Sequence, residues 1–374
     1  MHRRRFLSTL ASAIPLASCS ARRAQVRAPA FTGRRFARVN VSRDRVIRTV
    51  VGLRPYRPSG FVVRTESAGG KTIVHNYGHG GGGVTLSWGT AHLAAEQALP
   101  AGASRMAVLG AGAVGLATAR LLQERGIDVT IYAKDLPPGT TSNIAGAQWF
   151  PVNVFQRDQA APSFLSQFVE AARFSYRRFQ LMVGDYYGIR WLPNYQMSDE
   201  PFAEGGLLSK QSPIADLLPE LRELSPKEHP FPFPYVRQVD TMFVQPAVYL
   251  ESMLREFRLA GGAVLVKEMR GMEDVLALPQ SVIVNCTGLG AKALFNDPEL
   301  VPIKGQLTIL LPQPEVDYAT LPPDLYMFPR SDGILLGGTH ERGIWDLQPN
   351  REAEARIVDA HAGIFRDMRS WPVA

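Results

Sequence analysis

Cysteine is scarce in this sequence. Cys19 and Cys286 are the only two among 374 residues, which excludes a disulfide framework as the basis of the fold. After the first twenty residues no apolar run is long enough to span a bilayer, so no transmembrane helix is expected there. The apolar fraction of 45% excludes a disordered or fibrous chain and is sufficient for one large domain or two.

Acidic residues are also missing, locally, from the first part of the chain. The net charge of +7 depends strongly on arginines at positions 3–5 and on a following stretch that has no acidic residue, Arg22, Arg23, Arg27, Arg34, Arg35 and Arg38. A basic leader and a basic linker (residues 20–45) therefore explain most of the charge, and we predict no nucleic-acid partner.

Residues 1–19 have the pattern of an export signal, because a basic start precedes a modest apolar stretch that ends in small residues. Residues 3–7 resemble a twin-arginine (Tat) signal, and residues 16–19 resemble a lipobox, in which Cys19 would be lipidated. We expect an exported protein, periplasmic or attached to the membrane through Cys19, with residues 20–45 as a tether. Lipidation would leave Cys286 without a partner in the chain. The alternative is an ordinary basic N-terminus on a cytoplasmic protein.

Residues 106–132 read as strand, glycine turn, helix and strand. Gly110 permits the tight turn, Gly112 lets a pyrophosphate approach the backbone, and Gly115 lets the helix pack closely. Ala113 and Val114 open the helix, whose positive N-terminal end would face the phosphates. The pattern predicts dinucleotide binding. A glycine-rich turn without a ligand is the alternative, and about a hundred residues unexpectedly precede the unit.

Two further segments lie before this unit. Residues 46–51 are apolar, and Pro55 and Pro58 then make the segment around Tyr56 and Arg57 stiff and extended. An arginine on such a segment suits bidentate binding of a carboxylate. The second segment, 73–89, contains a glycine run at 80–83, expected where the backbone lies against a flat ligand. A surface arginine near a turn is the alternative for the first segment.

These segments resemble the D-amino-acid oxidase family of FAD-dependent amine oxidases. The resemblance rests on residues 52–58 and 74–81 and extends to 110–116, 140–142, 282–288, 325–329 and 336–338. In that family the first two motifs close the chain, whereas here they precede the dinucleotide fingerprint. A circular permutation explains this order, with residues 100–104 as the new link, and predicts that Val46 and Arg369 lie close together. The rival is a duplicated motif with the original C-terminus lost.

The resemblance implies an α/β fold with a Rossmann-type FAD-binding domain and a mixed α+β substrate domain that contains a large antiparallel sheet. We assign residues 46–148 and 240–292 to the first domain and 149–239 and 293–374 to the second. Helices are expected at 90–99, 164–184, 249–261 and 351–368, and strands at 242–248, 263–266, 282–288 and 302–311. The strands at 242–248, 263–266 and 282–288 are expected to extend the nucleotide-binding sheet.

The resemblance also implies the site residues. Arg54 would pair with the substrate carboxylate, Tyr326 would hydrogen-bond to it, and the carbonyl of Gly81 would accept from the amino group. FAD would be held by Gly80, Gly81, Gly82, Gly83, Val84, Thr85, Gly110, Gly112, Ala113, Val114, Gly115, Asp135, Thr140, Thr141, Ser142, Gly146 and Ala147. We expect no metal.

Some of these assignments have alternatives. Lys134 occupies the family's usual acidic position, so the ribose is assigned to the neighbouring Asp135. Residues 140–143 also suit a helix start, and both roles can hold. Tyr326 could be a core aromatic. Cys286 is expected to be an inert core thiol.

The excursion at 312–323 is shorter than the lid of the animal enzymes. Pro322 stands where those enzymes carry a second active-site tyrosine, which argues against a mobile tyrosine gate. Tyr318 could serve instead, although a surface tyrosine is the simpler interpretation.

The implied function is oxidative deamination of a small D-amino acid by hydride transfer to flavin N5, with oxygen as acceptor. The alternatives are an exported flavin dehydrogenase for an amine or imino acid that uses a quinone or a carrier, and a non-catalytic amine-binding flavoprotein. The sequence indicates no oligomeric state.

Overall fold

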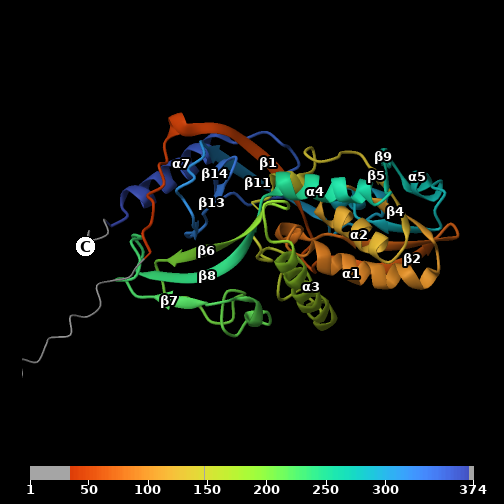
Figure 1. The fold of residues 1–374 in the computed structure, drawn as a ribbon, viewed down its shortest axis with the longest axis horizontal. Coiled ribbons are helices and arrows are strands. Elements are labelled where there is room, and N and C mark those ends of the chain that lie inside the picture. Colours follow the sequence, from red (N-terminus) through yellow and green to blue (C-terminus); the bar gives the residue numbers. More distant parts are fainter. Residues whose placement is uncertain (1–33, 147, 370–374) are drawn as a thin grey trace, which may run out of the picture. The chain divides into compact units, whose positions relative to one another are not determined.

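The computed structural model describes residues 34–146 and 148–369, which contain two β-sheets with helices packed against them (Figure 1). None of the helices in this part of the chain combines the length and the hydropathy needed to cross a bilayer. The signal, the lipobox with Cys19 and most of the linker lie outside the described residues.

The smaller sheet has six strands in the order β2-β3-β10-β4-β5-β9. All neighbours run parallel except β2 and β3. The strands are β2 (Val62–Ala68), β3 (Lys71–Tyr77), β4 (Arg105–Leu109), β5 (Asp128–Ala133), β9 (Ala263–Val266) and β10 (Val282–Asn285). The apolar run Met106 to Leu109 is fully buried at the centre, as expected for a parallel strand covered on both faces.

Helices α1, α2 and α4 lie along one face of this sheet, and α3 packs on α1 (Figure 1). On the other face, Val275 and Leu278 pack with Ile73, Ala107 and Ile283. The helices are α1 (Ser87–Ala98), α2 (Ala113–Glu124), α3 (Pro162–Leu181), α4 (Pro246–Leu259), α5 (Met272–Leu276), α6 (Ala291–Leu294) and α7 (Arg351–Arg366). Short 3-10 turns are η1 (Arg43–Arg45), η2 (Gly80–Gly82), η3 (Leu99–Ala101), η4 (Thr141–Ile144), η5 (Ala215–Leu217) and η6 (Gly288–Gly290).

The larger sheet has nine strands in the order β1-β11-β14-β13-β12-β6-β8-β7, with β15 beside β11. Its neighbours are antiparallel except β12 and β6, which are parallel. One face packs on α7, and the other faces the cavity described below. The strands are β1 (Val46–Tyr56), β6 (Ile189–Ser198), β7 (Arg222–Leu224), β8 (Tyr235–Val244), β11 (Val301–Leu310), β12 (Ala319–Leu321), β13 (Tyr326–Arg330), β14 (Gly333–Gly337) and β15 (Glu341–Arg342).

Two strands differ from the expected sheet membership. β1 was grouped with the nucleotide-binding part but pairs with β11 in the larger sheet. The strand expected at 242–248 was to extend the smaller sheet, but β8 pairs with β6 and ends at Val244, where the Pro246 ring opens α4. Strands β9 and β10 join the smaller sheet, as expected.

The excursion at 312–323 is built into the larger sheet through β12. Tyr318 is fully buried and donates to the carbonyl of Ala37 at 2.7 Å, so the interpretations as a gate and as a surface tyrosine are both wrong. An apolar ring at this position is better accommodated in the cluster beneath α7 than in water.

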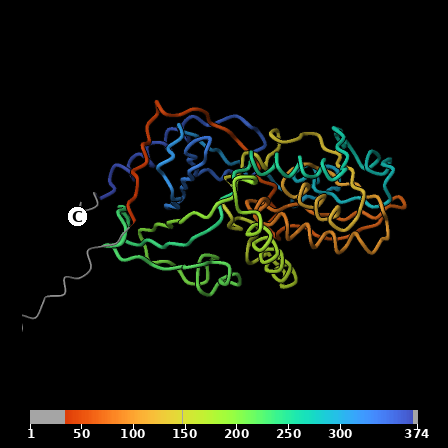
Figure 2. Tube along the Cα trace, in the orientation of Figure 1, coloured from red at the N-terminus to blue at the C-terminus, as the bar shows by residue number. Residues whose placement is uncertain are grey.

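The first described segment runs beside the last helix (Figure 2). Arg38 donates to the carbonyls of Arg366 and Met368 at 3.0 and 2.7 Å. Val46 packs against the apolar cluster that contains Met368.

Candidate active site

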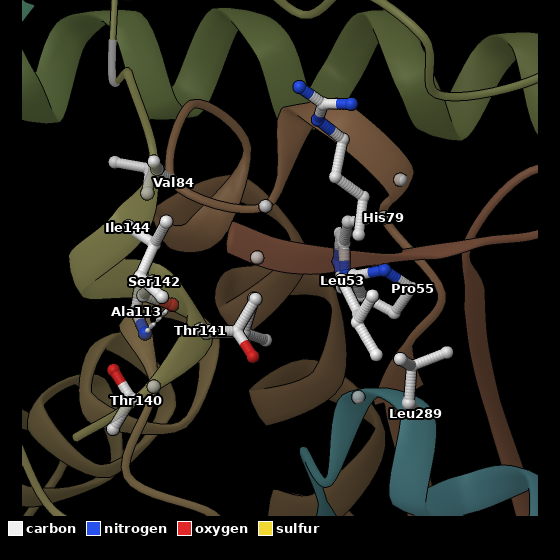
Figure 3. A pocket seen from close by; sticks show the side chains of 18 of the residues that line it. Leu53, Pro55, His79, Val84, Ala113, Thr140, Thr141, Ser142, Ile144 and Leu289 are labelled. Carbon is white, nitrogen blue, oxygen red and sulfur yellow. Dashed lines mark hydrogen bonds between the residues drawn. The ribbon is translucent and has the colours of Figure 1, made fainter. Parts of the chain in front are cut away.

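A cavity of about 800 Å³ lies between the carboxyl ends of the smaller sheet's strands and one face of the larger sheet. Its walls come from the turns after β3, β4, β5, β9 and β10 and from β1, β6, β11, β12 and β13. Figure 3 shows part of this lining, from Thr140 and Ala113 to Leu53 and Leu289. Ligands of open α/β sheets bind at such strand ends, where the strand order reverses.

The turn between β4 and α2 has the geometry predicted for a phosphate site. Gly110 has φ +103°, and a Cβ there would lie 2.6 Å from the carbonyl oxygen of Cys286. Gly112 lines the cavity at the start of α2, where a Cβ would lie 3.1 Å from Ser142 Oγ. The backbone N–H of Ala113 donates to that oxygen at 3.0 Å (Figure 3). The helix N-terminus therefore opens into the cavity with a hydroxyl beside it.

Gly115 has the packing role expected of it and does not line the cavity. A Cβ there would lie 2.1 Å from the carbonyl oxygen of Gly110, so only glycine allows the helix to approach the turn this closely. It is corrected from a contact residue to a packing residue.

Asp135 lines the cavity after β5, as expected for a group that holds a ribose. The neighbouring Lys134 forms an ion pair with Glu268 at 3.2 Å, and Glu268, after β9, lines the cavity too. The ribose assignment to Asp135 stays a prediction.

The glycine run serves the protein's own packing as well as the cavity. A Cβ on Gly80, where φ is +54°, would lie 2.1 Å from the carbonyl oxygen of Asn153, and the N–H of Gly81 donates to that oxygen at 3.0 Å. Gly82 was predicted to contact the cofactor, but it is buried against Val154 and does not line the cavity. The expectation that a flat ligand alone demands these glycines was incomplete, because residues 152–154 cross them.

The two arginines of the motif at 52–58 have different partners. Arg57 is held at 2.8 Å by Asp297 and at 2.6 Å by Glu299, and it does not line the cavity. Arg54 lines the cavity and pairs with no carboxylate in the described part of the chain; its Nη1 donates weakly, at 3.4 Å, to the carbonyl of Thr339. The guanidinium group of Arg54 is therefore available to an anionic ligand.

Tyr326 stands beside Arg54 in the cavity wall. Its ring lies over Gly337, where a Cβ would be 2.0 Å from the ring, and stacks on Phe328 at 5.1 Å. Burial raises the pKa of the Tyr326 hydroxyl, although the charge and the hydrogen bond of Arg54 act in the opposite direction. The phenol therefore stays neutral and can donate to a ligand. Tyr326 is partly a packing aromatic and partly a wall residue, which combines the two interpretations.

Most predicted cofactor residues are brought together in the lining. They are Gly80, Gly81, Gly83, Val84, Thr85, Gly110, Gly112, Ala113, Val114, Asp135, Thr140, Thr141, Ser142 and Gly146. Ala147 lies outside the described residues. In the described part of the chain no cluster of three or more histidine, cysteine or acidic side chains could hold a metal ion.

Cys286 is a buried free thiol, as predicted. Burial raises its pKa to about 12, so the thiol stays protonated and unreactive at neutral pH. Its side chain packs against Gly115 and Thr118 on α2.

Sequence analysis missed several lining residues, among them Gln148, Phe150, Gln196, Thr287 and Leu321. Gln196 belongs to β6, whose sequence contains proline, asparagine and glutamine and lacks the usual strand signature. Thr287 lies in the motif at 282–288, whose place after a buried strand could have indicated it.

The chain matches a known protein family in two segments. The model of the FAD dependent oxidoreductase family, DAO, matches residues 23–97 and 105–371. D-amino-acid oxidase of Streptomyces coelicolor is 30% identical over 258 residues, which cover 67% of this chain and 74% of that protein. Human D-aspartate oxidase is 26% identical over 264 residues, which cover 68% of this chain and 74% of that protein.

Solved structures with the same fold are more distant in sequence. Iminodiacetate oxidase from Chelativorans sp. BNC1 has a TM-score of 0.53 at 17% identity and covers 70% of this chain and 79% of its own. L-alpha-glycerophosphate oxidase from Mycoplasma pneumoniae, solved with FAD bound, has a TM-score of 0.53 at 15% identity. The match covers 71% of this chain and 79% of that protein.

Proposed function

Because the chain belongs to the DAO family of FAD dependent oxidoreductases, with FAD as cofactor and amino acid oxidase-type activity, we propose that its substrates are D-amino acids and its electron acceptor is oxygen. The observation that carries the proposal is Arg54, a cation without a carboxylate partner in the described chain, beside the neutral hydroxyl of Tyr326 in one cavity wall.

The residues present fit FAD. The N-terminus of α2 opens into the cavity without a side chain at Gly112 and with the Ser142 hydroxyl beside it, and Thr140 and Thr141 line the same cavity, which suits a pyrophosphate. Asp135 provides a carboxylate for a ribose, and His79, Gly80, Gly81, Gly83, Val84 and Thr85 line the same cavity. These residues would bind the cofactor in the cavity between the smaller and the larger sheet.

The substrate end is formed by the larger sheet. Arg54 would bind the substrate carboxylate through two N–H groups, and Tyr326 would donate a further hydrogen bond to it. We assign acceptance from the amino group to the carbonyl of Gly81. FAD, when bound, supplies the acceptor for the hydride that leaves the substrate Cα, and the chain's residues orient that C–H bond.

The cavity lining offers no obvious general base beside Arg54. Its carboxylates in the described chain, Asp135 and Glu268, follow β5 and β9 of the smaller sheet, and His79 is buried against Thr90 at 3.0 Å. Burial lowers the pKa of His79 to about 3. An amine that binds in its neutral form needs no base: loss of hydride leaves an iminium ion, which water converts to the 2-oxo acid and ammonium.

Anaerobic bleaching of the bound flavin tests the proposal most directly. A panel of D- and L-amino acids, glycine and sarcosine should bleach it only or fastest with D-amino acids. Bleaching by L-amino acids or sarcosine instead would refute D-specificity, and a flavin that no member bleaches would favour the non-catalytic alternative. Oxygen uptake compared with reduction of a quinone-like dye then separates an oxidase from a dehydrogenase.

Export and lipidation are proposed from residues 1–19 alone. Fractionation of cells that produce the full chain, with Cys19→Ala as the matched variant, should show the protein in the membrane fraction and the variant released from it. Equal distribution of the two would refute the lipid anchor.

We also propose that the chain is circularly permuted. The family match is divided at residues 98–104, which include the expected link, and Arg38 donates to the carbonyls of Arg366 and Met368 at the end of α7. Val46 packs on the cluster that contains Met368, so the segments that the conventional order would join lie side by side. A sequenced relative with the same motifs duplicated at both ends would favour the rival explanation.

A further inference from the structure

One row of side chains crosses the larger sheet on the face toward the cavity. Gln196 of β6 lies opposite Leu321 of β12. Strands β12 and β13 are antiparallel and Thr320 pairs with Met327, so Leu321 lies opposite Tyr326. Gln196, Leu321 and Tyr326 all line the cavity. Neighbouring strands lie about 4.8 Å apart, so the backbone of Gln196 is about 10 Å from that of Tyr326. A substrate held by its carboxylate at Tyr326 would therefore lie within side-chain reach of this row.

Two amide side chains of β6 have buried polar atoms without a protein partner. Within the described chain no hydrogen bond reaches Oε1 of Gln196 or the amide nitrogen and oxygen of Asn194. Asn194 is fully buried two residues before Gln196, on the same face of β6. Buried amides are normally paired, so these two indicate a ligand or water that is polar.

The nearest cation to Gln196 on this sheet already has partners. Arg237 of β8 lies directly opposite Gln196, but its guanidinium bonds to Glu223 at 2.9 Å and to the carbonyl of Leu208, and it stacks over Phe202 at 4.1 Å. Arg237 is absent from the cavity lining. Apart from Arg54, the lining's cations in the described chain are lysines after β5 and β9, Lys134 and Lys267. An acidic side chain would therefore meet no free positive charge here.

We propose that Gln196, supported by Asn194, forms a polar subsite that selects substrates whose side chain ends in a neutral hydrogen-bonding group, with a carboxamide as the best match. The proposal rests on the proposed D-amino acid oxidation. A carboxamide offers one donor group and one acceptor, as each protein amide does. An aliphatic side chain of the same shape leaves the buried amides unpaired, and a site built for hydrogen bonds rejects such an analogue strongly.

Three substrates of nearly equal shape test the subsite in the intact FAD-bound protein. D-asparagine, D-leucine and D-aspartate differ mainly in whether the side chain ends in an amide, two methyl groups or a carboxylate. The kcat/KM for D-asparagine should exceed both others at least tenfold. Equal or faster turnover of D-leucine or D-aspartate would overturn the subsite while leaving D-amino acid oxidation intact. Failure of every D-amino acid to reduce the flavin would overturn the proposed function and the subsite with it.

Substitution of Gln196 adds a second test. Gln196→Met should lower kcat/KM for D-asparagine at least tenfold and leave kcat/KM for D-leucine unchanged or higher. The exposed Gln348 lies outside the lining, and Gln348→Met is the matched control, expected to change neither substrate. An equal fall for both substrates would show a structural role and overturn the assignment. The comparison of substrates on the unaltered protein stands even if a variant does not fold.

Discussion

The pair of arginines in one motif allows a prediction with an internal control. Arg54→Ala should strongly lower substrate turnover while the protein stays folded and keeps FAD, because Arg54 faces the cavity and has no carboxylate partner in the described chain. Arg57→Ala should do the opposite. It removes the cation that holds Asp297 and Glu299, and it leaves the substrate wall intact.

The size of each effect follows from burial. Loss of one partner from a buried charge-assisted pair costs about 2–5 kcal/mol, so Arg54→Ala should lower kcat/KM by about 30-fold to about 4,000-fold. The Asp297 side chain is only 8% exposed, and an unpaired buried carboxylate destabilises a fold by about 3–5 kcal/mol. Arg57→Ala should therefore lower the free energy of unfolding by about that amount. Burial acts to raise the pKa of Asp297, but the hydrogen bond from Tyr77 and the charge of Arg57 outweigh it and lower the pKa below its usual value.

Two measurements separate the variants. Anaerobic stopped-flow reduction of the bound flavin gives the rate for each substrate, and thermal unfolding followed by circular dichroism gives stability. A rate of flavin reduction in Arg54→Ala equal to that of the unaltered protein would refute the carboxylate assignment. A stable Arg57→Ala protein that has lost turnover would show that the wrong arginine was assigned to the substrate.

The remaining predictions test other parts of the structure. Gly337→Ala should raise KM at least tenfold with FAD still bound, because the new Cβ would lie 2.0 Å from the ring of Tyr326; an unchanged KM would contradict the geometry. Burial lowers the pKa of each of three histidines, to about 3 or about 4, so below pH 6.5 the unfolded chain binds protons that the folded chain does not. The free energy of unfolding should then fall from pH 6.5 toward pH 4 by up to about 1.4 kcal/mol per pH unit for each of His79, His229 and His361. When the free energy of unfolding is measured by urea unfolding at several pH values between 7 and 5, it should fall less steeply with decreasing pH in His361→Leu than in the unaltered protein. A chain reordered as 105–369 followed by 34–99 should fold and bind FAD, as measured by flavin fluorescence; failure of this chain to fold would count against the permutation.

The part of the cavity assigned to the cofactor was predictable from sequence, because the steric requirements of its glycines are local. The turn from Gly110 to Gly115 has steric requirements that only a few backbone geometries meet, and the structure has the expected strand, turn and helix. The prolines of the motif at 52–58 indicate a stiff segment with an arginine, and the family resemblance then identified Arg54. Without the resemblance, Arg54 could not be distinguished from Arg57, because that distinction depends on Asp297 and Glu299, some 240 residues later in the chain.

The substrate end depends on long-range pairing and was predictable only in part. Gln196 reaches the cavity because β6 pairs with β12, a parallel contact between segments more than 120 residues apart that no local pattern encodes. The glycines at 80–82 show the complementary error, since part of what was taken for a ligand's requirement comes from residues 152–154 crossing them. A glycine run indicates that something approaches the backbone closely, and the sequence alone does not say whether it is a cofactor or the protein itself.

The arrangement of the two sheets is compatible with the proposed circular permutation. β1 lies at one end of the larger sheet and β3 lies near the end of the smaller one, and each needs neighbouring strands but no particular position in the sequence. α1, which follows β3, packs on α2, which begins directly after β4, so residues 98–104 have only a short gap to bridge. At the other end, α7 finishes beside residues 36–46. Because the two possible joins are both short, the same motifs can assemble one cavity in either order, and what the cavity requires is that Arg54, Tyr326 and the α2 turn meet.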